Sequence, residues 1–478
     1  MRKFIFIALS VLLLLSLTAL AYAEGPQITL GGSILMRGFY FNGVDFTGPY
    51  GVEISDYPTY LPANNGHNTF LGYNVNFNTE AASLYTTQAT LTVDAKVTDN
   101  LEGFMELETA QPIIGESGSY IWGTQDQKPV ANLYFRQLWI KYTGSGLLGV
   151  PAGVKVGHQL LTLGEKQFLN HERFGDDAIV VFVQPTKELT IAGLTAKLYE
   201  GPFSYYTPWT YYAQNTDDTD LYTILATYKL DKDNTIGINY SFINNSSLDL
   251  QFQNLGLHAN GLLAGALTYA AEFDTQFGHI YDTEYPVSHD LYGQEQLKFR
   301  GWGFMAKAGY KIDPVNLRAS FAIGSGDNDD SDGKIREFQT TMGSDMVSPL
   351  DAFVHYTQIY ERTLKTAALD QYLSGAFYRN TGIANTTYYN LGADIMATKD
   401  LSLSLDGFIL RATKSWPGVG GAKSLGSELD FKGCYKITKN FNYFLEAGVF
   451  WPGNWYGDTT GIEDNNVTQV VHGINLTF

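Results

Sequence analysis

The chain of 478 residues has a single cysteine, Cys434, and no long apolar run after its first 23 residues. One cysteine excludes an intramolecular disulfide, and no Cys-x-x-Cys-His motif is present to attach a c-type haem. The sequence also lacks the His-Glu-x-x-His motif of zinc proteases and the Gly-x-Ser-x-Gly motif of serine hydrolases. These absences leave no disulfide framework and no recognisable catalytic motif.

Basic residues are also scarce, because 31 Lys and Arg stand against 49 Asp and Glu, a formal net charge of −18. Such a chain is a poor binder of nucleic acid, whose phosphates are neutralised by Lys and Arg. Aromatic residues are abundant, at 14% of the total, and so are the 49 glycines. This composition fits a transmembrane β-barrel, in which each strand has one apolar and one polar face.

Residues 1–23 predict a cleaved signal peptide. Arg2 and Lys3 precede an apolar stretch, and Ala21-Tyr22-Ala23 fits the small-x-small cleavage pattern. The alternative is a membrane anchor, which the short apolar stretch and the cleavage pattern directly after it disfavour. Residues 24–478 are then expected to form one barrel domain, because no linker divides them.

The stretch Val467–Phe478 alternates between apolar and polar residues, with His472 as the exception on the apolar face. This period of two predicts a strand with unlike faces. An open sheet would leave it as an exposed edge, whereas a closed barrel pairs it with the first strand. A chain that ends on Phe478 also resembles bacterial outer-membrane barrels, and the resemblance implies that this residue is recognised by the barrel-assembly machinery.

Short polar turns alternate with long loops along the chain. The turns, such as Pro185–Glu188 and Asp313-Pro314, contain the residues that favour tight reversals. We therefore predict an all-β fold: a transmembrane antiparallel β-barrel of about 18 strands (16 is the alternative), with short periplasmic turns and long extracellular loops. The stretch Leu262–Asp274 is expected to be one strand. Either loop 42–83 or loop 325–385 is expected to fold into the lumen as a constriction, the alternative being a solvated external loop.

Charged residues of both signs share one face of the predicted strands. A Lys at mid-depth on a lipid-facing wall would cost about 2–4 kcal/mol, so the charged face is assigned to the lumen. The predicted lumen residues are Asp94, Lys96, Glu106, Glu108, Lys197, Glu272, Asp274, Lys307, Arg318, Asp394, Asp406, Glu428, Asp430, Lys432 and Glu446. Ten are acidic and five are basic, which predicts a weak cation preference.

Two segments resemble the alginate-export family of outer-membrane barrels. Val154–Asp177 reads VKVGHQLLTLGEKQFLNHERFGDD, and Ile323–Lys334 reads IGSGDNDDSDGK. The resemblance implies an 18-stranded barrel and an acidic polysaccharide as the transported substrate. A basic lumen would be needed for that substrate, and the sequence offers few lumen arginines beyond Arg318 and Arg136.

One acidic loop is a weak candidate for a divalent cation, through Asp327, Asp329, Asp330 and Asp332. An EF-hand needs a bidentate Glu at its twelfth position, and a frame set on Gly333 places Gln339 there. We therefore expect a solvated acidic loop, with no metal and no cofactor. Catalysis is not expected either, because His158, His171 and Glu172 form no recognisable constellation.

Three functions remain open. The first is an outer-membrane porin, a water-filled channel for passive diffusion of small hydrophilic solutes and ions. It would lie in outer-membrane lipid and lipopolysaccharide, as a monomer or a homotrimer. The second is a substrate-specific exporter of an acidic polysaccharide. The third is a structural barrel that hosts a redox partner. The first is preferred, because the predicted lumen carries both signs of charge and no basic stripe.

Overall fold

The computed structural model describes residues 26–43, 81–110, 120–122, 132–146, 149–199, 218–245, 249–281, 296–329, 332–341, 356–361, 382–415, 421–455 and 466–478. The predicted signal peptide, residues 1–23, lies outside these ranges, and so does most of loop 42–83. Within the described residues, no helix is long and apolar enough to cross a membrane.

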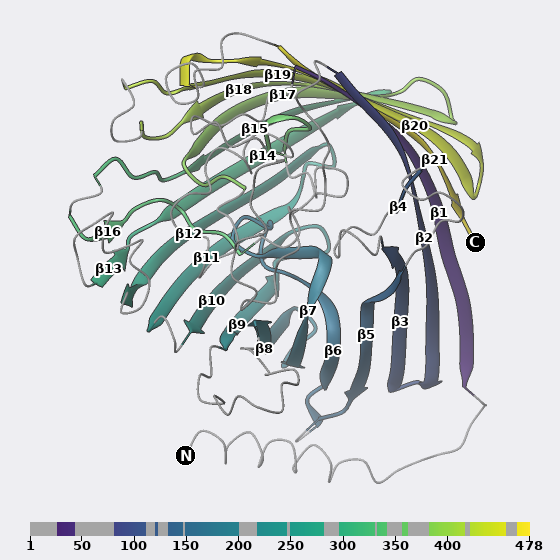
Figure 1. The fold of residues 1–478 in the computed structure, drawn as a ribbon. Helices are drawn as coiled ribbons and strands as arrows, with labels where there is room; N and C mark the ends of the chain where they lie inside the picture. Colours follow the sequence, from purple (N-terminus) through teal and green to yellow (C-terminus); the bar gives the residue numbers. More distant parts are fainter. Residues whose placement is uncertain are drawn as a thin grey trace, which may run out of the picture.

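The described strands belong to one sheet and are β1 (Gln27–Asn42), β2 (Ala81–Thr98), β3 (Leu101–Ala110), β4 (Tyr120–Ile121), β5 (Asn132–Gly144), β6 (Ala152–Thr162), β7 (Asn170–Val183), β8 (Leu189–Tyr199), β9 (Thr219–Lys229), β10 (Thr235–Asn245), β11 (Leu250–Leu263), β12 (Leu267–Tyr281), β13 (Gln296–Phe299), β14 (Trp302–Ile312), β15 (Val315–Gly324), β16 (Lys334–Ile335), β17 (Thr386–Met396), β18 (Leu401–Ala412), β19 (Ser424–Thr438), β20 (Phe441–Pro452) and β21 (Val467–Thr477). Apart from the short strands β4, β13 and β16, these form a closed antiparallel barrel of 18 strands (Figure 1). The predicted fold class is confirmed.

The barrel closes between its first and last strands. β1 pairs antiparallel with β21, from Ser33 opposite Thr477 to Asn42 opposite Thr468. The pairing that the C-terminal sequence predicts is therefore present, and the final strand leaves no free edge.

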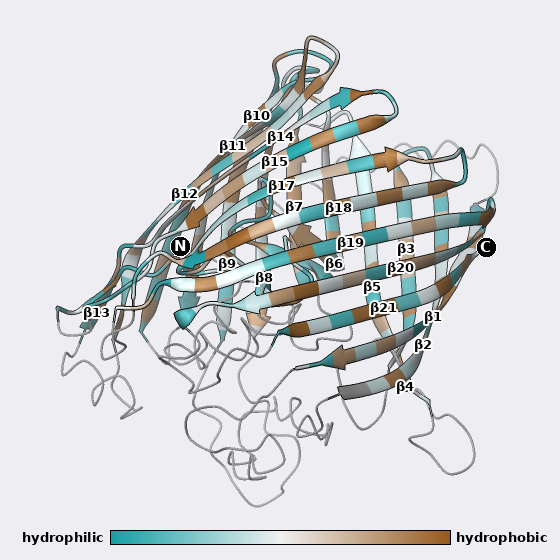
Figure 2. Ribbon diagram, turned by 90° about the horizontal axis from the view of Figure 1, so that it is seen from above, coloured by the Kyte–Doolittle hydropathy of each residue, from teal (hydrophilic) through white to brown (hydrophobic). Residues whose placement is uncertain are grey.

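Each wall strand has one apolar and one polar face, and hydropathy alternates along the strands in Figure 2. In β10, for example, Ile236, Ile238 and Tyr240 are exposed on the outer surface, whereas Asn239 and Ser241 at the alternate positions are buried inside. Successive side chains of a strand point to opposite faces, so this alternation separates a lipid-facing surface from the lumen.

The strands are joined by short turns at one end and by longer connections at the other. The turns at Pro185–Glu188 and Asp313-Pro314 lie where the sequence predicts them. One turn was missed. Residues 264–266 reverse the chain between β11 and β12, so the prediction of a single strand over Leu262–Asp274 was wrong. Ala264 and Gly265 both have positive φ there, a conformation that Gly adopts freely and that Ala rarely adopts.

The hydrophobic core lies inside the barrel rather than between layers. It occupies the end with the long connections and is built from inward-facing residues of the wall and residues of the connections themselves. Its largest buried side chains are Trp455, Tyr360, Tyr388, Phe168, Phe252, Phe299, Phe338 and Phe450. This half of the lumen is therefore packed with protein, whereas the other half is lined by polar wall residues.

Candidate functional site in the barrel lumen

Three described segments fold into the lumen from the long-connection end. Segment 163–169 connects β6 to β7, and segments 332–341 and 356–361 both belong to the connection between β15 and β17. Their apolar side chains join the internal core, where Phe168 stacks on Phe252 with ring centroids 5.9 Å apart. Loop 325–385 thus supplies inserted segments, and segment 163–169 adds a constriction that was not predicted.

Segment 163–169 reaches wall strands that are not its neighbours. Its tip carries two residues with positive φ, Gly164 and Lys166, which reverse the chain inside the lumen. The Glu165 carboxylate accepts a hydrogen bond from Asn260 Nδ2 on β11 at 2.6 Å. The Glu165 backbone N–H donates to the Glu272 carboxylate on β12. The segment therefore crosses the lumen past β8, β9 and β10.

Segment 332–341 is held between segment 163–169 and β12. The Thr341 backbone N–H donates to the Phe168 carbonyl at 3.0 Å, and Gln339 and Gln276 exchange hydrogen bonds of 2.8 and 2.7 Å. His171 on β7 contacts the Thr341 carbonyl through Nε2, and its Nδ1 lies 2.6 Å from Asp176. His171 therefore ties an inserted segment to the wall.

Segment 356–361 rests on two carboxylates of β19. The backbone N–H groups of Ile359 and Tyr360 donate to Glu428 at 2.6 and 2.9 Å. The backbone N–H of Gln358 donates to Asp430 at 3.1 Å. Three consecutive N–H groups thus end on one pair of wall carboxylates, which gives the short segment a fixed position in the lumen.

The inward face carries three carboxyl pairs of the same spacing, Glu106/Glu108 on β3, Glu272/Asp274 on β12 and Glu428/Asp430 on β19. Residues two apart in a strand share a face, so both members of each pair point inward. All six side chains are buried. The latter two pairs hold inserted segments, so these predicted pore residues act as anchors in the structure.

The pair on β3 contacts arginines instead. Arg136 Nη1 lies 2.9 and 3.0 Å from the two carboxylate oxygens of Glu106, and Arg173 Nη1 lies 2.8 Å from Glu108. Arg136 also donates to the backbone carbonyls of Glu172, at 2.6 Å, and of Arg173, at 2.9 Å. These charge-assisted bonds fix both guanidinium groups at the surface of the lumen.

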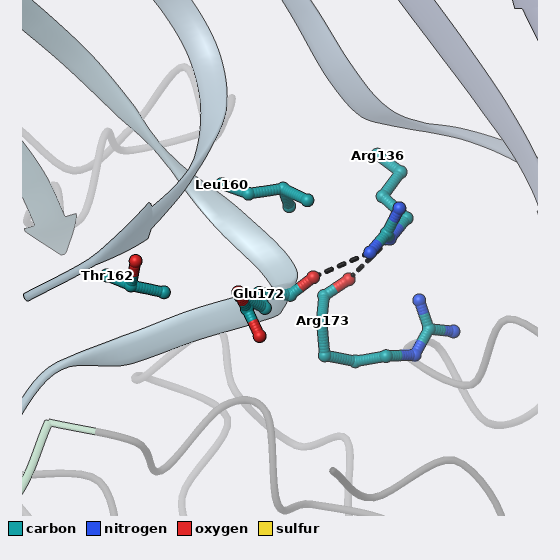
Figure 3. A pocket seen from close by; sticks show the side chains of 5 residues that line it. All are labelled: Arg136, Leu160, Thr162, Glu172 and Arg173. Carbon is teal, nitrogen blue, oxygen red and sulfur yellow. Dashed lines mark hydrogen bonds between the residues drawn. The ribbon is translucent and has the colours of Figure 1, made fainter. Parts of the chain in front are cut away.

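A cavity of about 270 Å³ opens beside this cluster. Figure 3 shows the side chains that line it, Arg136, Leu160, Thr162, Glu172 and Arg173. Its wall combines guanidinium groups, a carboxylate, a hydroxyl and one apolar chain.

A further charged cluster links β15, β17 and β18. Arg318 lies 2.8 Å from Asp394 and 2.8 Å from Asp406, and its Nη2 also donates to Ser404 Oγ at 2.8 Å. The three charged residues were predicted to face the lumen, and they lie together on its wall. One cation between two carboxylates leaves a local excess of negative charge.

The acidic and basic residues predicted to line the lumen differ in their exposure to water. Seven of the ten acids are buried, namely Glu106, Glu108, Glu272, Asp274, Asp406, Glu428 and Asp430. The other three, Asp94, Asp394 and Glu446, are half-buried. Lys96, Lys307 and Lys432 are exposed. Acidic residues therefore make up a smaller share of the water-exposed lumen residues than of the predicted list as a whole.

Lys197 does not face the lumen. Its strand neighbour is Asp220, and the next pair along the same face is Thr195 with Tyr222. Tyr222 belongs to the exposed outer surface, so Lys197 lies on that surface and pairs with Asp218 at 2.9 Å and Asp220 at 3.0 Å. A paired charge is tolerated there because Lys197 lies at the long-connection end of β8, away from the middle of the membrane.

Two basic residues on the inner wall near the short turns were not predicted from the sequence. Lys155 Nζ lies 4.1 Å from the centroid of the Trp139 ring, and Lys141 lies 3.4 Å from Glu102. Strand β5 contains a β-bulge opposite Glu106 that shifts the alternation of its faces, so a simple count of two fails there. The spacing of Trp139 and Lys141, two residues apart, could have indicated from the sequence that both face the lumen.

Two aspartates of the acidic loop form ion pairs with the loop's own basic residues. Arg336 hydrogen-bonds to Asp332 and lies 3.5 Å from Asp327, and Lys334 Nζ lies 2.9 Å from Asp332. The hydrogen bond from Arg336 lowers the pKa of Asp332 to about 2. No group of three or more metal-ligating side chains occurs among the described residues. Asp329 is exposed, and Asp330 lies outside the described residues.

Comparison with known proteins places the chain among outer-membrane barrels. The model of the alginate export family matches residues 66–470. No curated protein matches the chain. The crystal structure of Pseudomonas aeruginosa OccK3 (OpdO) is similar, with a TM-score of 0.53, 12% identity, and coverage of 94% of this chain and 95% of that one. The outer membrane protein OprD of Pseudomonas aeruginosa gives a TM-score of 0.51 and 10% identity, with coverage of 96% of each chain. At these identities the likeness shows the fold.

Proposed function

Because the chain belongs to the alginate export family and is an integral β-barrel of the bacterial outer membrane, we propose that it forms a water-filled channel for passive diffusion of small hydrophilic solutes and ions. One observation carries this proposal. The outer wall is apolar, whereas the inner wall holds charged residues of both signs, including the exposed Lys96, Lys307 and Lys432. The charged inner wall in the half of the lumen toward the short turns supports passage of hydrated solutes.

A weak cation preference is the finer part of the proposal. It rests on the ten predicted lumen acids, and the burial of seven of them reduces the number that meet passing ions directly. Asp94, Asp394 and Glu446 are the acids with most access to water. Charged side chains along a pore set its ion preference, so the sign of the selectivity reports which group of charges dominates.

Export of an acidic polysaccharide is the second candidate. Family membership favours it, and so do the exposed Lys96, Lys307 and Lys432 together with Lys141 and Lys155 on the inner wall. These lysines lie in the half of the lumen toward the short turns, which is the periplasmic side in outer-membrane barrels. A polyanion arriving from the periplasm would meet them first.

Planar-bilayer recording of the refolded mature barrel under a salt gradient tests both candidates. A steady conductance with a small cation-selective reversal potential supports the diffusion channel. An anion-selective current that is blocked by an acidic polysaccharide and by no neutral polysaccharide supports the exporter. Absence of any conductance from a correctly folded barrel contradicts the diffusion channel.

The remaining expectations stay proposals. We propose that the chain has no enzymatic activity, in keeping with a transport family, and that Phe478 is read by the barrel-assembly machinery. A homotrimer, contact with lipopolysaccharide and a hosted redox partner are each open to test by purification from native membranes. Co-purification of a multihaem protein in fixed ratio would favour the structural role over the channel.

A further inference from the structure

The carboxyl pair Glu272/Asp274 is built differently from the pair Glu106/Glu108. Arginines neutralise the pair on β3. Around the pair on β12 the hydrogen-bond donors are neutral: the Glu165 backbone N–H to Glu272, and Asn254 Nδ2 to Asp274 at 2.8 Å. Both side chains are about 1% exposed. Ionising both buried carboxylates, with no cation bonded to either, carries a large desolvation free energy.

One oxygen of each carboxyl group is left without a donor. Glu272 Oε1 and Asp274 Oδ2 are buried and have no hydrogen-bond partner among the described residues. Glu272 and Asp274 stand two residues apart on the inward face of β12, so their buried carboxyl groups are neighbours. Two neighbouring carboxylates repel each other, and a hydrogen on one of them supplies the donor that the two unpartnered oxygens lack.

Water has little room to take the place of that proton. Gly164 at the tip of segment 163–169 packs directly on Glu272, and a Cβ built on it would lie 2.6 Å from Glu272 Oε1. The inserted segment thus covers the carboxyl pair, and the pair holds the segment through the Glu165 N–H. Binding of the segment and protonation of the pair are therefore coupled.

We propose that Glu272 and Asp274 share one proton and form a proton-binding site that keeps segment 163–169 inside the lumen. Loss of the proton leaves two adjacent carboxylates, which must move apart or take up water, and either change removes the surface on which Gly164 packs. The segment then leaves the lumen. This site adds proton-dependent opening to the proposed channel, and its existence does not depend on the solute carried.

The same construction occurs on β19. Glu428 and Asp430 are 2% and 3% exposed, they share the inward face of β19, and Asp430 Oδ1 has no donor among the described residues. Their other oxygens accept backbone N–H groups of segment 356–361. The same arrangement of a buried carboxyl pair beneath an inserted segment thus occurs twice in the barrel. A single misplaced side chain on β12 would not account for both.

Several charged groups face the pair on β12 and bear on its proton. Glu165 and Lys166 belong to the inserted segment, His258 lies directly opposite Glu272 on β11, Lys307 projects from β14, and Glu361 belongs to segment 356–361. Lys307 and Lys166 favour ionisation of the pair, whereas Glu165 and Glu361 oppose it. Titration of His258 is removed from the test by a His258→Gln background.

The test measures exposure of segment 163–169 as a function of pH. A reporter variant, Gln167→Cys in a Cys434→Ser, His258→Gln background, is labelled with a membrane-impermeant maleimide. Gln167 is buried in the closed arrangement, and Lys399→Cys in a short turn provides a fully exposed reference. The ratio of the two labelling rates cancels the ordinary pH dependence of the thiol.

The ratio is expected to rise with pH, by up to about tenfold per pH unit if one proton leaves with each opening event. Glu272→Gln supplies an N–H to the orphan oxygen of Asp274, so its ratio is expected to stay low and independent of pH. Asp274→Asn provides the same donor from the other side and serves if the first variant does not fold. A flat ratio in the reporter protein, or an unchanged slope in both folded variants, overturns the proposal. Labelling needs no ion current, so a failure of the channel function is distinguished from a failure of this site.

Discussion

Gly32 and Phe478 exchange two backbone hydrogen bonds, with Gly32 N–H to Phe478 O at 2.9 Å and Phe478 N–H to Gly32 O at 3.1 Å. A Cβ added to Gly32 would lie 2.8 Å from the Phe478 ring and 2.4 Å from the Thr90 carbonyl oxygen. The residue that ends the chain is therefore seated on a glycine of the first strand. This close approach continues the pairing of β1 with β21 that closes the barrel.

Gly32→Ala is expected to lower the free energy of unfolding by about 1–3 kcal/mol, because the backbone of a neighbouring strand must shift to admit the methyl group. Gly407→Ala is the matched control, since its Cβ would have the Leu391 carbonyl as its nearest neighbour at 3.9 Å. Urea unfolding of the two refolded variants in lipid vesicles measures the difference. Equal midpoints would show that the approach of Gly32 to Phe478 is not tight.

Arg136→Met is expected to destabilise the barrel by about 3–5 kcal/mol, because it leaves the buried Glu106 carboxylate without its cation. Lys141→Met removes a partner from Glu102 in a pair that is more than one third exposed, and it is expected to cost at most about 1 kcal/mol. The same urea measurement compares them. A loss for Arg136→Met no larger than that for Lys141→Met would contradict burial of the Glu106 pair.

The acidic loop gives a prediction for low pH. Hydrogen bonding from Arg336 holds the pKa of Asp332 at about 2, below the ordinary value of 3.8. The ion pair therefore supports the loop fully above the ordinary carboxyl range and loses its contribution as the pH falls through about 2. Carbon-13 chemical shifts of the Asp332 carboxyl should titrate at that low pH, and Arg336→Gln should move the midpoint up toward 3.8. An ordinary midpoint in the unaltered protein would rule out the contact.

Ion preference is expected to respond to the exposed lysines more than to the buried acids. Replacing Lys307 and Lys432 by Gln removes two positive charges from the wetted wall, so the reversal potential should move toward cation selectivity. Lys197→Gln, on the outer surface, should leave it unchanged. A larger change in reversal potential for Lys197→Gln than for the double replacement of Lys307 and Lys432 would contradict the assignment of these lysines to the outer and inner faces.

Much of the fold follows from the alternation of side chains along the sequence. Val467–Phe478 predicts a closing strand because its two faces differ, and the charged face of β19, with Asp430 and Lys432, is inward because lipid excludes charge. Lys197 escaped this argument, since the cost of an outward charge falls near the membrane surface. The bulge opposite Glu106 escaped it as well, because one extra residue reverses the faces beyond it.

The candidate site was less accessible from sequence. The positions of Glu272 and Glu428 in their strands predict that they line the pore. Nothing in those strands indicates the segments that cover them. Contacts such as Glu165 with Asn260 join residues far apart in the chain, and their existence depends on which connection enters the lumen. Sequence spacing fixes the face of a residue but leaves open what lies against that face.

The most direct test of the account is the single-channel conductance of the mature barrel compared with a variant in which segment 163–169 is replaced by a short Gly-Ser turn. If the barrel holds an aqueous channel that segment 163–169 narrows, the unaltered protein should give small current steps and the variant clearly larger ones at the same salt concentration. Equal steps would show that segment 163–169 does not constrict the channel. Absence of current from both folded proteins would contradict the channel itself.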